Sequence, residues 1–353
     1  MFKPDTVLVV GAGASSELKF PLGTQLSGRI TDNLRWVDDT GGYGGALKDQ
    51  QTHNILQRLN EETQQYFDAA RIINAGVRHA VSIDAFIDTH RDKPYVGKLG
   101  KLQIALEIAR AEARSDLMID DSNSRNRLDF ARADVMRSWL VPFAKILLDG
   151  CRASELEMIG WGLTIVCFNY DRCIEQYLCA AIADMMAISY RDAHDVVSNM
   201  QIIHPYGTLG RLPDSPFGAS VGVPFGKSPP LSSAIESIRT YTEEMSEQET
   251  LAQLRKAVGE AKTTVFLGFS FAPQNMALLQ PPDQKKPFES RRYFTTGVGI
   301  EHVAHAEISE RMLRLAGSSA QYSTATVMPN ATCAEAMASL SPLLIDPSPK
   351  LNR

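Results

Sequence analysis

The distribution of apolar and polar residues along the chain alternates between short apolar runs and longer segments with helical spacing. The runs of strand length lie at Thr6–Val10, Thr164–Phe168, Ile202–Ile203, Val265–Leu267 and near Ala325–Val327. Continuous apolar runs of this kind are typical of parallel strands that are buried on both faces. Because these runs alternate with helical segments, we predict an α/β fold with a Rossmann-type, doubly wound parallel sheet and helices on both faces.

Helical spacing directly follows several of the predicted strands. A helix after Ser16 is expected to carry Leu26 and Ile30 on one face, and another helix is expected from Asp171 onward. A long helix is predicted at about 234–261. The polar and basic segment KKPFESRRYF at 285–294 is predicted to be a loop.

The region from about 41 to 150 has a different pattern. Glycines open this region, and helical spacing then continues without a clear strand. We therefore predict a single domain over residues 1–340 with a helical insertion at about 41–150. Three prolines from Ser341 onward predict an irregular tail at 341–353.

Composition and charge narrow the function classes. The 353 residues carry a net charge of −5, so no excess of lysine and arginine supports strong non-specific binding to nucleic acid or to membranes. The five cysteines include no CxxC pair, which favours free thiols in a reducing compartment. No secretory leader is visible, and no apolar run reaches the roughly 20 residues that span a bilayer. We expect a cytoplasmic protein.

The segment GAGAS at Gly11–Ser15 follows the first strand and precedes a helix. Backbone N–H groups in such a turn, together with the helix N-terminus, are suited to bind a phosphate. The segment departs from two familiar fingerprints. Ser16 stands where the dehydrogenase fingerprint has its third glycine, and no lysine follows as in a P-loop. A tight turn without a ligand is the alternative interpretation.

Polar residues and glycines also follow three further predicted strands. Asn169 and Asp171 follow the second strand, His204 follows the third, and Gly268 and Ser270 follow the fourth. Ligands of parallel sheets bind outside the carboxyl ends of the strands, so we expect these residues to form one site. Structural roles are the alternatives: a helix cap for Asp171, a core histidine for His204 and a strand-exit turn for Gly268.

These segments, in their order along the chain, resemble the motifs of the sirtuin fold and, more closely, those of the sirtuin-like NADases of bacterial anti-phage defence. The resemblance covers about Val7 to Val327. The paired cysteines that hold zinc in sirtuin deacylases have no counterpart here, so the resemblance favours cleavage of NAD⁺ over protein deacylation. The segments that carry it are GAGAS at 11–15, SIDAF at 82–86, FNYD at 168–171, HPYG at 204–207 and GFSF at 268–271.

The resemblance implies hydrolysis of NAD⁺ to nicotinamide and ADP-ribose, with NAD⁺ as the substrate and no metal ion. The sequence does not distinguish this hydrolysis from cyclisation of the ADP-ribose product. It implies Asn169 and His204 as catalytic residues: Asn169 would position the ribose or the attacking water, and His204 would accept a proton. The binding residues that it implies are Gly11, Ala12, Gly13, Ala14, Ser15, Asp171, Tyr206, Gly207, Gly268 and Ser270.

The resemblance also implies an NAD-depleting effector of abortive infection that forms a homo-oligomer. Its activator would be a partner protein, of an ATPase, helicase or Argonaute type. Three alternatives remain open. One is an NAD-dependent protein deacylase or ADP-ribosyl transferase, and another is a regulatory subunit that binds NAD⁺ or ADP-ribose without turnover. The third is a structural subunit of a larger assembly, which is compatible with catalysis.

Four further features carry weaker signals. His302 and His305 have the spacing of two metal ligands but no third ligand, so a surface helix or loop is favoured. The basic cluster at 285–292 is interpreted as a solvated loop, with NAD⁺ phosphates, a partner or nucleic acid as alternatives. Asp84 and Asp88 face either the site or solvent. The segment 212–233, rich in proline and glycine, is a candidate lid.

Overall fold

The computed structural model describes residues 1–37, 45–119, 127–216, 221–241, 243, 248–282 and 289–347. Several features that the sequence singles out lie partly outside these residues. They are the glycines at 41, 42 and 44, the lysines at 285 and 286, residues 217–220 of the candidate lid, and the end of the tail from 348.

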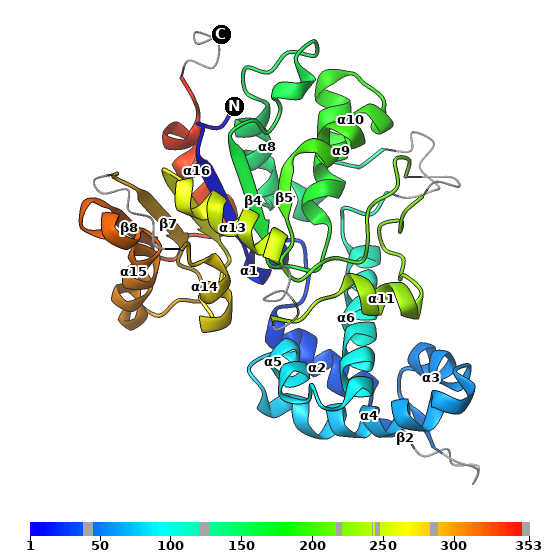
Figure 1. Ribbon diagram of the computed structural model, residues 1–353. Helices are drawn as coiled ribbons and strands as arrows, with labels where there is room; N and C mark the ends of the chain where they lie inside the picture. Colours follow the sequence, from blue (N-terminus) through cyan, green and yellow to red (C-terminus); the bar gives the residue numbers. More distant parts are fainter. Residues whose placement is uncertain are drawn as a thin grey trace.

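Within the described residues, a parallel sheet of six strands forms the centre of the molecule (Figure 1). The strand order is β5-β4-β1-β6-β7-β8. The chain therefore starts in the middle, adds two strands on one side, and then crosses over to add three on the other. The strands are β1 (Thr6–Val10), β4 (Leu163–Cys167), β5 (Gln201–Ile203), β6 (Thr263–Leu267), β7 (Arg292–Thr296) and β8 (Thr324–Met328).

This order is that of the Rossmann fold, so the prediction of a Rossmann-type parallel sheet is confirmed. The direction of strand addition reverses between β1 and β6. In such sheets, the crevice at the reversal point is where dinucleotides bind, outside the carboxyl ends of the strands.

Strand β7 corrects the prediction of a loop at 285–294. Residues Arg292–Thr296 form a strand that pairs with β6 and β8, and Tyr293 and Phe294 are buried. A short run of aromatic and β-branched residues follows the two arginines at 291 and 292, and such a run favours a strand. The polar residues before it made the segment resemble a loop.

Helices cover both faces of the sheet, as predicted, because side chains of successive strand residues point to opposite faces. Val7 and Val9 belong to one apolar core, and Leu8 and Val10 belong to the other. The first core includes residues of α13 (Gln248–Glu260), α14 (Pro273–Leu279) and α15 (His305–Arg314). The second includes residues of α8 (Leu140–Leu148), α9 (Cys173–Met186), α10 (Tyr190–Asn199) and α16 (Cys333–Leu344).

Two predicted helices are interrupted. The helix expected after Ser16 is split into α1 (Ala12–Ser16) and α2 (Gly23–Asn33), because Lys19 has a φ of 67° and Pro21 follows. The helix expected at 234–261 is wrong as one element. Residues Leu231–Ser237 form α11, and Ile238 then pairs with Gly207 in an isolated bridge before α13.

The prediction of an irregular tail from 341 is also wrong for residues 341–344. Helix α16 continues to Leu344, although Pro342 lies inside it. Ile345 then pairs with Phe2, and the backbone N–H of Asp346 donates to the carbonyl oxygen of Met1. The segment that follows α16 is thereby attached to the residues before β1.

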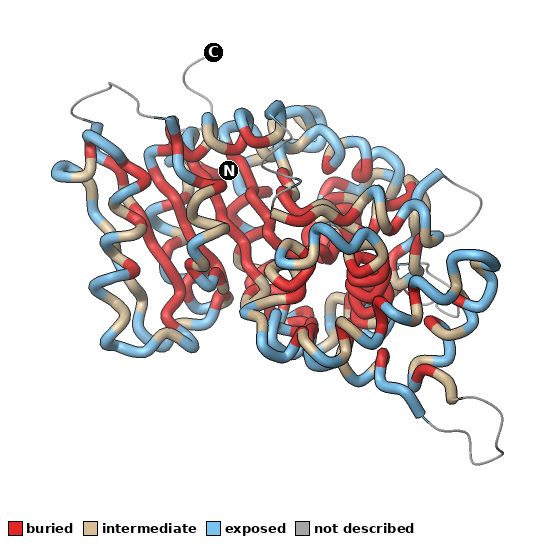
Figure 2. Tube along the Cα trace, turned by 60° about the horizontal axis from the view of Figure 1, so that its bottom comes forward, coloured by how far each residue is buried: buried red, intermediate tan, exposed pale blue. Residues whose placement is uncertain are grey.

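A second group of helices lies beyond the end of the sheet where α1 follows β1 (Figure 1). It contains α3 (Gln50–Gln57), α4 (Thr63–Gly76), α5 (Ile83–Thr89) and α6 (Pro94–Arg114), with α2 packed on α4 and α6. Helix α6 is the most buried part of this group (Figure 2). A two-residue strand, β3 (Ala46–Leu47), pairs with β2 (Trp36–Val37), so the expectation of no strand in this region is wrong for this pair.

Helix α8 lies within the predicted insertion but packs on the sheet, against α9 and α16. The remaining short helix of the region is α7 (Ala133–Arg137). The group that gathers at the carboxyl edge of the sheet is therefore α2 to α6, and it covers that edge with helices from an early part of the chain.

Candidate functional site

The four predicted turns lie at the same edge of the sheet. The register aligns Val10 with both Cys167 and Leu267, so Gly11, Phe168 and Gly268 leave the sheet at one level. Val166 is aligned with Ile203, which brings His204 to the same edge. All the residues predicted for the site follow β1, β4, β5 or β6 and therefore lie along this edge.

The two glycines after β1 pack directly against the turn after β6. A Cβ atom on Gly13 would lie 2.7 Å from the Cα of Gly268, and one on Gly11 would lie 2.6 Å from the carbonyl oxygen of Gly268. The backbone N–H groups of Gly11 and Gly13 donate to Leu267 and Gly268 at 2.9 Å. The absence of a side chain at Gly11 and Gly13 therefore makes room for the turn after β6, whose backbone is their close neighbour.

Helix α1 carries the rest of the first motif. Ala12 is its first residue, and Ala14 and Ser15 are buried. The side-chain nitrogen of Asn169 donates to the carbonyl oxygen of Gly11 at 3.0 Å and to Oγ of Ser15 at 2.8 Å. Both amide hydrogens of Asn169 are thus engaged within the protein. Its Oδ1 accepts no hydrogen bond from the described residues and remains able to accept one from a ligand hydroxyl.

Asp171 is buried and has a structural role. Its Oδ1 accepts a hydrogen bond from the backbone N–H of Cys173 at 3.2 Å, an Asx turn that starts α9. Burial raises the pKa of the Asp171 carboxyl, and hydrogen bonds from Cys173 and Ser15 offset part of that rise. The carboxylate therefore connects α9 to α1. These contacts support the alternative interpretation of Asp171 as a helix cap.

His204 is paired on both ring nitrogens. Nδ1 lies 3.1 Å from the carbonyl oxygen of Asn169, and Nε2 lies 2.9 Å from Oε1 of Glu175 on α9. Both partners are acceptors, so both nitrogens donate and the ring carries a positive charge. Burial alone would lower the pKa of His204, but the carboxylate of Glu175 and the thiol of Cys167 raise it well above its usual value.

This arrangement bears on the predicted role of His204. Asn169 and His204 do lie side by side, because the imidazole contacts the backbone of Asn169. However, a ring that already donates from both nitrogens has no lone pair with which to accept a proton. In this conformation, His204 holds the turn after β4 against α9.

Asp84 belongs to the site, a point that the sequence left open. The hydroxyl of Tyr170, from the FNYD segment, donates to Oδ1 of Asp84 on α5. Burial raises the pKa of Asp84 to about 6, and the nearby carboxylate of Asp88 contributes to the rise. Oδ2 of Asp88 is buried and has no hydrogen-bond partner within the described residues. The SIDAF motif therefore brings a carboxyl group that titrates near neutrality to the edge of the sheet.

Aromatic rings join the turns after β4, β5 and β6. Phe168 packs against both Tyr206 and Phe269, with ring centroids 5.7 and 5.2 Å apart. The hydroxyl of Tyr206 donates to Oδ1 of Asn275 on α14 at 2.6 Å, so Tyr206 spans the edge from β5 to the helix after β6. The turns after β4, β5 and β6 are thus joined by packed aromatic rings and by the hydrogen bond of Tyr206.

The remaining predicted residues are backbone features of these turns. Gly207 has a φ of 70°, and a Cβ there would lie 1.8 Å from the carbonyl oxygen of Ser237. Ser270 is exposed, between the buried rings of Phe269 and Phe271. Phe271 has a φ of 55°, which is a strained conformation for a buried aromatic residue.

The described part of the candidate lid is anchored rather than loose. Glu112 and Arg172 form a fully buried ion pair, with Nη2 and Oε2 2.5 Å apart. Arg172 also donates to the carbonyl oxygens of Gly210 and Pro224, and Glu112 accepts from the backbone N–H of Gly226 at 2.9 Å. Both ends of the loop are therefore fixed to the core, outside residues 217–220.

Other features of the sequence do not join the site. His302 and His305 pack ring to ring, with centroids 5.0 Å apart, and no third metal-ligating side chain completes a cluster among the described residues. The five cysteines are free, and four of them are buried. None of the described helices combines the length and the apolar content that crossing a bilayer requires.

The fold and the arrangement of its turns define a Rossmann-type α/β protein whose polar groups gather where the strand order reverses. Comparison with known proteins adds no closer assignment, because neither a family model nor a curated protein matches the chain.

Proposed function

We propose that the protein binds NAD⁺ across the carboxyl ends of β1 and β6 and hydrolyses the bond between nicotinamide and ribose. The observation that carries this proposal is the reversal of strand order between β1 and β6, with the GAGAS and GFSF turns on either side of it. Parallel sheets of this order bind dinucleotides at that position. The resemblance of the five motifs to sirtuin-like NADases supports cleavage as well as binding.

In the proposed reaction, water adds to C1′ of the nicotinamide ribose while the C1′–N bond breaks. Nicotinamide leaves as a neutral group, ADP-ribose forms, and one proton is released. Asn169 is the proposed ligand of the ribose or of the water, because its Oδ1 is the part of its amide that the protein does not use. Fixing the ribose and the water in one geometry supplies much of the rate enhancement in reactions of this kind.

Asp84 is the proposed acceptor of the released proton. A carboxyl group with a pKa of about 6 is mostly ionised at neutral pH and is still basic enough to take a proton. His204 is a proposed positioning residue, since it holds the carbonyl group of Asn169 while its own nitrogens are engaged. This assignment revises the role that the resemblance implies for His204.

The wider role follows from the resemblance alone. Such a hydrolase would deplete NAD⁺ in anti-phage defence. It would act in the cytoplasm as a homo-oligomer, beside a partner protein that activates it. The negative net charge of the chain does not favour direct binding to nucleic acid.

A second candidate function is binding of NAD⁺ or ADP-ribose without turnover. The pairing of both ring nitrogens of His204 favours it, because the residue that resembles the catalytic histidine has no basic nitrogen in this conformation. Such a protein would report the concentration of the nucleotide to a partner instead of consuming it.

Chromatography of NAD⁺ after incubation with the purified protein separates these functions. Hydrolysis predicts nicotinamide and ADP-ribose in equal amounts without any acceptor peptide, and Asn169→Ala is expected to abolish their release while the protein stays folded. Asn199→Ala is the control at an exposed position, where the side-chain amide donates to the backbone carbonyl of Asp195. Intact NAD⁺ that remains bound would support the second candidate, and activity of Asn169→Ala equal to the parent would refute the proposed role of Asn169.

A further inference from the structure

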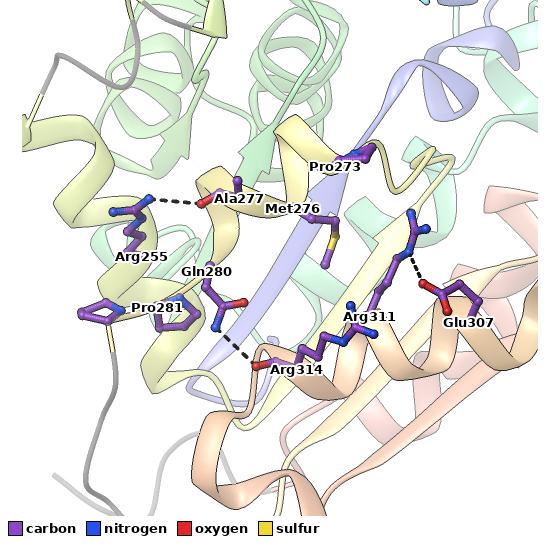
Figure 3. Close-up of a pocket in the computed structure, with 10 residues that line it drawn as sticks. Arg255, Pro273, Met276, Ala277, Gln280, Pro281, Glu307, Arg311 and Arg314 are labelled. Carbon is purple, nitrogen blue, oxygen red and sulfur yellow. Dashed lines mark hydrogen bonds and ion pairs between the residues drawn. The ribbon is translucent and has the colours of Figure 1, made fainter.

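A cavity of about 630 Å³ opens between α13, α14 and α15 (Figure 3). Arg255 of α13 and the pair Arg311 and Arg314 of α15 line it, and we call it the arginine cavity. Glu307 is the one carboxylate among its described lining residues. Its volume falls in the range of sites that hold small organic ligands.

The charges in the arginine cavity are not balanced. Arg255 donates to the carbonyl oxygens of Ala277 at 3.1 Å and Leu278 at 3.3 Å, and it pairs with no carboxylate among the described residues. Arg311 pairs with Glu307 at 2.9 Å, and Arg314 pairs with Glu310 at 2.7 Å. Two carboxylates, Glu307 and Glu310, thus pair with two of the guanidinium groups. The positive charge of Arg255 is left without a described carboxylate, which favours an anionic ligand.

Two of the guanidinium groups are held in place before any ligand arrives. The carbonyl groups at the end of α14 fix Arg255. Arg311 is fixed between Glu307 and the carbonyl oxygen of Phe271, to which it donates at 2.9 Å. A ligand that binds such side chains loses less conformational entropy than one that must order them.

The wall between the arginines is apolar. Met276 and Pro281 line it together with Pro273, and the side chain of Met276 lies between α14 and α15 in Figure 3. A flexible thioether and proline rings suit the flat face of a ring system. Planar guanidinium groups match the oxygen geometry of phosphate. Because the cavity combines an apolar wall with guanidinium groups, we infer that the arginine cavity is a binding site for a nucleoside phosphate.

The described lining residues of the arginine cavity include none of the residues predicted to bind NAD⁺. The two sites are neighbours, because Arg311 donates to the carbonyl oxygen of Phe271, which follows Ser270 in the turn after β6. The inference therefore stands whether or not the protein hydrolyses NAD⁺.

Titration calorimetry of the full-length protein with ADP, inorganic phosphate and adenosine tests the inference. ADP is expected to bind saturably and more tightly than either phosphate or adenosine. Arg314→Gln is expected to weaken ADP binding about ten-fold, because a charged hydrogen bond to phosphate is lost. Glu307→Gln is expected to tighten binding, since it removes the lining carboxylate while an amide oxygen can still accept from Arg311.

A control variant assigns the effect to the cavity. Arg71→Gln is matched to Arg314→Gln, because the side chains are 59% and 58% exposed and each forms an ion pair of 2.7 Å. ADP affinity is expected to stay unchanged in Arg71→Gln. The inference is overturned if ADP does not bind, if Arg314→Gln and Glu307→Gln bind it like the parent, or if adenosine or phosphate binds as tightly as ADP.

Discussion

The imidazole of His204 forms an ion pair with Glu175, with Nε2 and Oε1 2.9 Å apart in a largely buried position. Glu175 lies on α9, which begins just after the FNYD segment, so the pair ties the end of β5 to the helix that follows β4. The pairing explains why a histidine at the expected site of proton transfer is charged at neutral pH. It also predicts how stability depends on pH.

Glu175→Gln is expected to destabilise the protein by about 3 kcal/mol at neutral pH, because it leaves a buried imidazolium without its counter-charge. The raised pKa of His204 gives stability that is complete below the unfolded-state pKa and is lost as the pH rises through the folded-state pKa. In Glu175→Gln this alkaline loss moves to lower pH. Urea unfolding between pH 5 and pH 9 measures both effects, with Asp68→Asn as an exposed control. An unchanged pH dependence would show that the pair is not ionised.

In the parent, the rate of nicotinamide release is expected to fall at acidic pH with a midpoint near pH 6. Asp84→Asn is expected to remove this dependence of the rate on pH. It should also raise the free energy of unfolding at pH 8 by about 2 kcal/mol, because the raised pKa makes the ionised carboxylate costly above that pH. Rates and unfolding midpoints across pH 5–8 give both quantities. Asp92→Asn, at an exposed position, is expected to change neither. If the rate of the variant still falls at acidic pH as in the parent, Asp84 is excluded as the proton acceptor.

Gly13→Ala is expected to destabilise the protein by about 3 kcal/mol or to prevent folding, because the new methyl group collides with the backbone of Gly268. Gly28→Ala is the matched control. Gly28 lies in α2 with open space around it, so alanine should stabilise that helix by about 0.5–1 kcal/mol. Thermal unfolding distinguishes the two. Equal stability of the two variants would mean that the turns after β1 and β6 do not pack as described.

Glu112→Gln is expected to cost about 3–5 kcal/mol, since it leaves the buried guanidinium of Arg172 without a carboxylate. The loop on either side of residues 217–220 should then become sensitive to proteases, because Arg172 holds its two ends. Limited proteolysis with mass spectrometry locates the cuts. Parental resistance of this loop would argue that the ion pair does not anchor it.

The sequence predicts the centre of the sheet well and its connections less well. Strand β1 and the turn after it follow from an apolar run that stops at Gly11, which is a local signal. Strand β7 was missed because arginines precede its aromatic residues. The break between α11 and α13 depends on the pairing of Ile238 with Gly207, and spacing alone does not reveal that contact.

For the site, too, the sequence predicts local features but not contacts between distant segments. The sequence predicts that Asn169, His204 and Gly268 lie at one edge of the sheet, because each follows a predicted strand. Their partners could not be placed in this way, because Glu175 contacts His204 from 29 residues away and Asp84 contacts Tyr170 from 86 residues away. The sequence therefore indicates where the chemistry gathers but not which atoms are already engaged.

A crystal structure of the protein with a non-hydrolysable NAD⁺ analogue tests the central claim most directly. The account predicts that the analogue lies across the carboxyl ends of β1 and β6, with its nicotinamide ribose within hydrogen-bond distance of Oδ1 of Asn169. An analogue bound elsewhere, the arginine cavity included, would contradict the assignment of this edge as the NAD⁺ site.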